Sequence, residues 1–354
     1  MESIDDMVEE YLNHPPVDRE LSIRSIRLNE STVDGGFVEI PVLPQRPAVK
    51  PGEEDAFLLN TKRTLRDLNI SETETVSTEV ITIGFQENIP DEVRGPDRSG
   101  EQSLKIYSFL SPEKVSKEGL KDGVPLVIFS HGGKIHSEVI ASSGYLPMLY
   151  EDNPDMILIA MDHRGPQSHK AKEDYGLDDR VADILIALKY TQDNLVEEYA
   201  DKGIKWNGNI IIIGDSMGGE VATVVAEKVG ADGLVLTEPA AYSVFAHHVK
   251  FGQKSEQEPV FGGEKGVIKT KSPEDSYAFD SIKKYANEPN SKILMIKMKN
   301  DKIVGSVPDK YIESINDTDP QKIEVLEVEG GHGSTTPEEV RKISGFVKSL
   351  KGKK

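Results

Sequence analysis

A serine between two glycines stands at the end of an apolar run. In the stretch NIIIIGDSMGGEVATVVAEK, residues 209–228, consecutive isoleucines lead into Gly-Asp-Ser-Met-Gly. β-Branched residues on both faces predict a strand buried in a parallel sheet, and the Ala/Val/Glu-rich stretch from Gly218 to Val229 predicts a helix. A sharp turn between the two would raise the Ser216 hydroxyl above the sheet, at a helix N-terminus that favours negative charge. Ser216 is therefore the candidate nucleophile.

A serine nucleophile needs a base and an acid, and candidates for both follow apolar stretches near the C-terminus. His332 stands between two glycines after the stretch at residues 322–328, and the other histidines fit less well because they lie in earlier loops. Asp301 follows the stretch at residues 293–299, with Asp309 and Glu313 as rivals further along. We predict His332 as the base and Asp301 as the acid that orients it.

Backbone N–H groups must also stabilise the oxyanion that forms when a serine attacks a carbonyl. One donor should be Met217, the residue after the nucleophile. The second should come from the sequence FSHGG, where Gly132 and Gly133 follow another apolar stretch. Glycines there allow the backbone to approach the oxyanion closely. This chemistry needs no metal and no cofactor, and we expect neither.

Alternating strands and helices are predicted to position these residues. Strand-like stretches occupy residues 76–85, 103–110, 125–130, 156–162, 209–215, 233–239, 293–299 and 322–328. Helical stretches lie between several of them, most clearly at 177–199 and 336–350. This alternation predicts a doubly wound α/β sheet, with the first two stretches as an antiparallel edge.

Two segments fall outside this alternation. Residues 1–74 form a predicted N-terminal extension or cap, with a short amphipathic helix near residues 4–12 and no regular pattern from 21 to 74. Residues 75–354 form the predicted main domain, and about residues 240–292 are too long for an ordinary loop, so we expect a lid insertion. Glu220, on the helix after the nucleophile, could form a salt bridge or hydrogen bond under the site, but we expect it on a solvated helix face.

Composition excludes several classes of protein. The 354 residues carry a net charge of −19, so we expect neither nucleic acid nor an anionic membrane as a partner. No apolar run is long enough to span a bilayer, and the first residues do not resemble a secretory signal. Cysteine is absent, which excludes disulfides, thiolate metal sites and a cysteine nucleophile. We expect a cytoplasmic protein.

Taken together, FSHGG, AMDHRG, IIIIGDSMGGEVA, NDKIVGSVP and EGGHGS resemble the α/β-hydrolase superfamily of serine esterases and lipases. The resemblance covers residues 79–350 and includes the order Ser216, Asp301, His332. It implies a mostly parallel eight-stranded sheet, a Ser216–His332–Asp301 triad and an acyl-serine intermediate.

One branch of this superfamily, the carboxylesterases related to hormone-sensitive lipase, looks most similar. In that branch the N-terminal extension contributes to a cap over the site. Lys134 stands where the branch usually has a third glycine, and FSHGG and MDHRG also look like dienelactone hydrolases and serine peptidases. The branch is therefore left open.

The resulting functional prediction is a serine hydrolase that cleaves small carboxylic esters with short to medium acyl chains. Two alternatives are retained: a non-catalytic member of the fold that binds a small molecule, and a peptidase or acyltransferase that uses the same triad. Covalent labelling of the serine distinguishes the first alternative from an enzyme.

Overall fold

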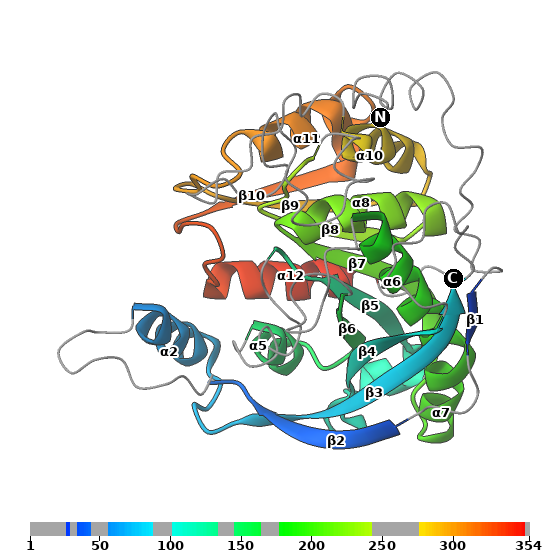
Figure 1. The fold of residues 1–354 in the computed structure, drawn as a ribbon. Helices are drawn as coiled ribbons and strands as arrows, with labels where there is room; N and C mark the ends of the chain where they lie inside the picture. Colours follow the sequence, from blue (N-terminus) through cyan, green and yellow to red (C-terminus); the bar gives the residue numbers. More distant parts are fainter. Residues whose placement is uncertain are drawn as a thin grey trace.

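The fold is built around one twisted β-sheet with helices on both faces (Figure 1). A computed structural model describes residues 26–28, 34–43, 56–87, 101–133, 145–163, 177–242 and 276–350. Within these ranges the sheet has ten strands in the order β1-β3-β4-β6-β5-β7-β8-β9-β10, with β2 also paired to β3.

The strands are β1 (Ile26–Leu28), β2 (Asp34–Pro41), β3 (Thr75–Glu87), β4 (Glu101–Phe109), β5 (Val124–Ser130), β6 (Ile157–Asp162), β7 (Trp206–Asp215), β8 (Gly233–Thr237), β9 (Ile293–Met298) and β10 (Ile323–Val328). The α-helices are α2 (Ala56–Leu68), α3 (Lys117–Asp122), α5 (Tyr145–Asp152), α6 (Leu177–Tyr190), α7 (Val196–Asp201), α8 (Met217–Val229), α10 (Tyr277–Asn287), α11 (Val307–Asn316) and α12 (Pro337–Ser349). A π-helical turn, Thr191–Leu195, joins α6 to α7.

The direction of the strands confirms the predicted fold class. The six strands β6, β5, β7, β8, β9 and β10 are parallel, and β4 pairs antiparallel with both β6 and β3. All eight predicted strands are present as β3 to β10, and β3 and β4 form the antiparallel edge. A mostly parallel sheet with a serine turn after its central strand β7 is the α/β-hydrolase fold.

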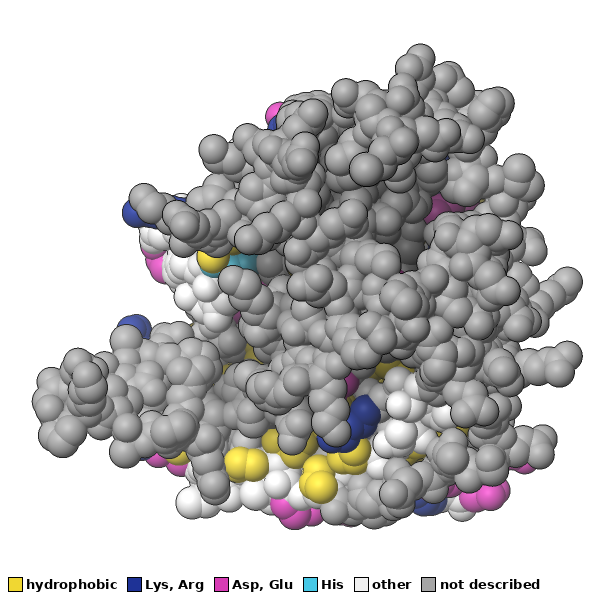
Figure 2. All heavy atoms as spheres, in the orientation of Figure 1, with side chains coloured by type: hydrophobic (Ala, Val, Ile, Leu, Met, Phe, Trp, Pro, Cys, Tyr) yellow, Lys and Arg dark blue, Asp and Glu magenta, His cyan; other side chains and the backbone are white. Residues whose placement is uncertain are grey.

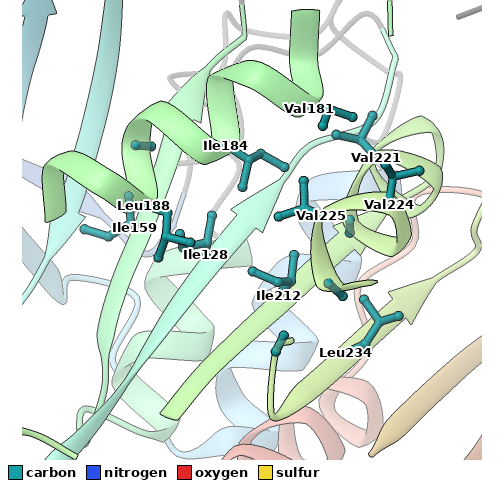
Figure 3. Close-up of a cluster of buried hydrophobic side chains, with 14 of the residues drawn as sticks. Ile128, Ile159, Val181, Ile184, Leu188, Ile212, Val221, Val224, Val225 and Leu234 are labelled. Carbon is teal, nitrogen blue, oxygen red and sulfur yellow. The ribbon is translucent and has the colours of Figure 1, made fainter. Parts of the chain in front are cut away.

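The buried strands separate two hydrophobic clusters because neighbouring side chains point to opposite faces of the sheet. Ile212 of β7 lies in one cluster, while Ile211 and Ile213 lie in the other. In the first cluster, α6 and α8 cover the sheet, and Figure 3 shows Ile184 and Val225 directed at the strands that carry Ile128, Ile159, Ile212 and Leu234. In the second cluster, α5 and α12 cover the opposite face.

The segment before residue 75 contains regular structure that the sequence pattern did not indicate. We predicted no regular pattern between residues 21 and 74, which was wrong, because β1, β2 and α2 lie there. The long strand β3 pairs with both β1 and β2 along the edge that faces away from β4, so this segment extends the sheet. The amphipathic helix predicted near residues 4–12 lies outside the described residues. The division of the chain at residue 74 stays a prediction.

The predicted lid segment, about residues 240–292, is described only at its two ends. Its second end includes α10, whose Phe279 and Tyr285 are buried in the first cluster against α8 and α11, as part of the main fold. Residues 243–275 lie outside the described residues, so a lid stays a prediction for them.

Glu220 connects the two described ends of this segment. It is fully buried in α8, and one carboxylate oxygen accepts the Tyr242 N–H at 2.6 Å while the other accepts the Ser276 hydroxyl at 2.8 Å. The expectation of a solvated helix face was therefore wrong for this residue. A buried carboxylate is retained because both of its oxygens have donors.

Exposed large hydrophobic side chains are scattered over the described residues, at Leu59, Leu120, Ile303 and Val325, and further hydrophobic side chains reach the surface at the antiparallel edge of the sheet. Figure 2 shows the latter over the part of the molecule where β2 and β3 lie, among acidic and basic ones. Val38 of β2 is 43% exposed. None of the described helices combines the length and the apolar character that a bilayer span requires.

Candidate active site

The turn after β7 has the geometry of a nucleophile elbow. Ser216 lies between the last residue of β7 and the first residue of α8, with φ 51° and ψ −118°. A positive φ is uncommon outside glycine and is kept only where surrounding contacts enforce it. Here the Ser216 N–H donates to the Thr237 carbonyl at 2.9 Å, and the Ser216 carbonyl accepts the Ala240 N–H at 2.8 Å. The strand β8 and the loop after it therefore fix the elbow.

The glycines around Ser216 are required by close backbone contacts. A Cβ on Gly218 would lie 2.1 Å from the carbonyl oxygen of Ser130, at the end of β5. A Cβ on Gly214 would lie 2.4 Å from the carbonyl oxygen of Gly218. Both distances are below any that real side chains reach, so α8 can start this close to β5 and β7 only with glycine at these positions.

The structure brings the three predicted triad residues together in one hydrogen-bonded chain. His332 lies in the loop after β10, and its Nε2 is 2.9 Å from the Ser216 Oγ. Its Nδ1 is 2.8 Å from the Asp301 Oδ2, in the loop after β9. With a carboxylate beside Nδ1, the ring carries its proton there, which leaves Nε2 free to accept the serine proton.

Asp301 is held in place by its own loop. Its Oδ1 accepts the N–H groups of Ile303 and Val304 at 2.7 and 3.2 Å, so the other oxygen is directed at His332. The rival acids lie elsewhere, because Asp309 in α11 pairs with Lys297 and Glu313 is exposed on the same helix.

The predicted oxyanion donors also lie at the elbow, although not all of them are equivalent. A Cβ built on Gly132 would lie 3.0 Å from the Ser216 Cβ, and one on Gly133 would lie 3.2 Å from the Met217 Cε. The loop after β5 therefore packs directly on the nucleophile. Burial raises the pKa of Asp215, and its carboxylate accepts the Gly132 N–H, a hydrogen bond that opposes this rise. The assignment of the N–H groups of Met217, Gly133 and Gly132 as oxyanion donors stays a prediction. Lys134 lies outside the described residues.

Arg180 of α6 supports this loop and was missed at the level of sequence. It is fully buried, and its guanidinium donates to the carbonyls of His131 and Gly132 at 3.3 and 3.4 Å. Burial lowers the pKa of Arg180 to about 10, so the side chain remains a cation at neutral pH. No clear signal marks it in the sequence, because Arg180 follows two aspartates in a helix that also contains Asp183 and Lys189.

A second carboxylate, Glu238, was also missed. It follows β8, and its Oε2 lies 3.0 Å from the His332 Nδ1 and accepts the Gly333 N–H at 2.7 Å. The available signal was an acid directly after the buried strand GLVLT, which is the neighbour of β7.

Glu238 belongs to a group of buried acids beneath the triad. Burial, reinforced by the charge of Asp215, raises the pKa of Glu238 to about 9. Burial and the Asp215 charge likewise raise the pKa of Glu339, in α12, to about 8. Tyr145 of α5 faces the same group, and burial, with the charges of the three acids, raises its pKa well above the usual value.

Ligand atoms of Glu238, Asp301 and His332 lie within 4.8 Å of one another, a spacing that could accommodate a metal ion. A metal there would occupy the His332 Nδ1 that now faces Asp301, and would take the Glu238 oxygen that now accepts the Gly333 N–H. We therefore interpret these groups as an acid–base network. The expectation that the protein uses no metal and no cofactor stays a prediction.

Comparison with known proteins gave similarity at the level of structure alone. No protein-family profile and no curated sequence matches the chain. Similar solved structures include an esterase from the archaeon Pyrobaculum calidifontis (19% identity, 85% of this chain and 93% of that chain, TM-score 0.49). Another is Est1E from Butyrivibrio proteoclasticus with bound ferulic acid (17% identity, 70% of this chain and 94% of that chain, TM-score 0.46). A third is carboxyl esterase 2 of the fungus Tuber melanosporum (15% identity, 73% of this chain and 85% of that chain, TM-score 0.47). Similarities this distant do not decide what this chain does, and the hormone-sensitive lipase branch stays a prediction.

Proposed function

We propose that this protein is a serine hydrolase that cleaves carboxylic esters through an acyl-serine intermediate. The observation that carries the proposal is the continuous chain from Asp301 Oδ2 through the His332 ring to Ser216 Oγ, with contacts of 2.8 and 2.9 Å. Such a chain activates a serine hydroxyl, which is otherwise a poor nucleophile at neutral pH.

Each group has one role in the proposed reaction. Ser216 Oγ bonds to the ester carbonyl carbon while His332 Nε2 takes the hydroxyl proton, and the carbonyl oxygen becomes an oxyanion held by the N–H groups of Met217 and Gly133. The intermediate expels the alcohol, which receives the proton from Nε2. Water then attacks the acyl-serine by the same steps and releases the acid. Asp301 keeps the Nδ1 proton in place and stabilises the imidazolium throughout.

The proposed substrate class follows from the composition of the chain. Aromatic residues make up only 6% of the chain, which favours small and fairly soluble esters with short to medium acyl chains over emulsified fat. The partner is accordingly a small-molecule ester.

The test is hydrolysis of p-nitrophenyl esters from acetate to palmitate by the wild type, Ser216→Ala and a matched control, Ser314→Ala in α11. We expect Ser216→Ala to lose about 10⁶-fold in kcat, because the rest of a triad contributes little without its nucleophile. Ser314→Ala should keep wild-type rates, and a fluorophosphonate probe should label all but Ser216→Ala. Neither turnover nor labelling in the folded wild type would refute the proposal and favour the ligand-binding alternative.

A further inference from the structure

His332 faces two carboxylates where the reaction requires one. The strands β8 and β9 are parallel neighbours in the sheet, so the residues that follow them emerge side by side. Asp301 follows β9 and lies 2.8 Å from the His332 Nδ1, while Glu238 follows β8 and lies 3.0 Å from the same nitrogen. The contact with Asp301 has the geometry of a hydrogen bond, so Nδ1 donates to Asp301 and Glu238 stands beside this bond.

The position of Glu238 is enforced by its surroundings. Its φ of 47° is unfavourable for any residue other than glycine, and its N–H is held by the Ile296 carbonyl of β9 at 3.0 Å. Backbone strain of this kind costs on the order of 1–3 kcal/mol and is concentrated at functional sites. Oε2 accepts the N–H of Gly333, the residue after His332, so Glu238 also fixes the loop that carries the base.

One carboxylate oxygen of Glu238 accepts no hydrogen bond from the described residues. Oε1 is buried and has no hydrogen-bond partner among the described residues, and the side chain is 2% exposed. A buried oxygen without a partner costs about 1–3 kcal/mol, so a carboxyl group that served only to fill space would be replaced at a gain in stability. This arrangement suits a group that acts on its neighbour.

We propose that Glu238 is a positioning residue for His332, a second acid that orients the imidazole together with Asp301 and replaces Asp301 when Asp301 is lost. The proposal rests on the Ser216–His332–Asp301 triad proposed above. The proposal also makes the positioning of His332 depend on pH, because Glu238 is neutral at pH 7 and becomes charged at higher pH.

The charge on Glu238 follows from the groups that face it. Burial, then the charges of Asp215, Asp301 and Glu339, raise the pKa of Glu238 to about 9, against the Gly333 hydrogen bond that lowers it. Among the described residues, Tyr145 and His332 are further ionisable neighbours of Glu238. At pH 7, Glu238 is therefore a neutral acid and Asp301 supplies the charge. Above pH 9, Glu238 gives its proton to solvent, and a second negative charge faces Nδ1.

A double-mutant cycle tests this role. The variants are Asp301→Ala, Glu238→Gln and the pair, with kcat/KM measured relative to wild type from pH 6.5 to 10. The glutamine side chain is isosteric with glutamate and still accepts the Gly333 N–H, so Glu238→Gln alone should cost only a few-fold. Asp301→Ala should lose about 10⁴-fold at pH 6.5, as expected when the orienting acid of a triad is removed.

The pH dependence separates a positioning role from a structural one. Removing Asp301 removes one charge that raises the pKa of Glu238, so Glu238 ionises below pH 9 in this variant. Relative activity of Asp301→Ala should then rise with pH by at least about tenfold, equivalent to one pK unit of interaction. The double variant should not rise. Equal costs of Glu238→Gln in both backgrounds, at every pH, would overturn the proposal.

A second variant, Asp301→Asn, keeps the experiment informative if Asp301→Ala does not fold. Asp301→Ala removes the acceptor for the N–H groups of Ile303 and Val304, whereas Asp301→Asn keeps it. If Asp301→Ala is unfolded by circular dichroism, the same cycle is run with Asp301→Asn and read by the rate of fluorophosphonate labelling. Asp309→Asn, in α11, is the matched control and should behave as wild type.

Failure of this inference is distinguishable from failure of the proposed function. If Ser216→Ala hydrolysed the ester as fast as the wild type, the triad itself would be refuted. An activity that depends on Ser216, with identical pH profiles for Asp301→Ala and the double variant, overturns only the role of Glu238.

Discussion

Replacing Glu339 with glutamine should make the stability of the protein less dependent on pH. Glu339 is 3% exposed in the first turn of α12, where its carboxylate accepts the Thr336 N–H and its own N–H donates to the Thr336 hydroxyl. Burial and the Asp215 charge raise the pKa of Glu339 from 4.5 to about 8, although the Thr336 hydrogen bond lowers it. At pH 7 the folded protein therefore carries Glu339 as a neutral acid.

The sign and size of the effect follow from this difference. Below pH 4.5 the carboxyl group of Glu339 is protonated in both the folded and the unfolded chain, so it does not make the free energy of unfolding depend on pH. Between there and pH 8 only the unfolded chain has released the proton, so the free energy of unfolding falls by about 1.4 kcal/mol per pH unit. From pH 5 to pH 8, Glu339 thus lowers the free energy of unfolding by about 3 kcal/mol. Glutamine keeps the shape and the acceptor but does not titrate.

Urea unfolding at pH 5 and pH 8 measures this directly. The matched control is Glu338→Gln, the same change at the neighbouring exposed position of the same helix turn. Relative to wild type, Glu339→Gln should gain about 3 kcal/mol between pH 5 and pH 8, and Glu338→Gln should change by less than about 1 kcal/mol, the usual size of a helix-terminus charge effect. The same difference for Glu339→Gln at both pH values would refute the reasoning, because Glu339 would then be ionised in the folded state.

Two further predictions concern the elbow and the loop beside it. Arg180→Met removes the donor to the carbonyls of His131 and Gly132, so kcat for a p-nitrophenyl ester should fall by about 10²–10³-fold, the cost of a misplaced oxyanion donor. An unchanged kcat would contradict this. Gly218→Ala forces a methyl group to within 2.1 Å of the Ser130 carbonyl oxygen, so it should destabilise the fold by more than about 3 kcal/mol, and a wild-type melting temperature would show that the turn can relax.

The parts of the site that sequence could predict are those that depend on local pattern. A β-branched run, a serine between glycines and a helical stretch are contiguous, so β7, the elbow and α8 were predictable together. Asp301 and His332 could be placed because each directly follows an apolar stretch, and the ends of parallel strands share one edge of the sheet.

The parts that were not predicted depend on contacts between distant segments. Glu238 also follows an apolar stretch, but its contact with His332 arises from the adjacency of β8 and β9, which the local pattern does not reveal. Arg180 and Glu220 look like ordinary polar residues of amphipathic helices, yet both are fully buried because backbone groups from other loops pair with them. The strand β2 requires the free edge of β3, which a local pattern does not reveal.

The pairing of Tyr242 and Ser276 with the single carboxylate of Glu220 has a practical consequence for engineering. Glu220 of α8 thus holds the last described residue before residue 243 and the first described residue after residue 275, so both ends of the intervening segment are fixed to the main fold. The entropy of closing such a loop grows only slowly with its length, by about 0.6 kcal/mol for each doubling. A change in the number of residues between Tyr242 and Ser276 should therefore cost little stability, provided that Glu220 keeps both donors.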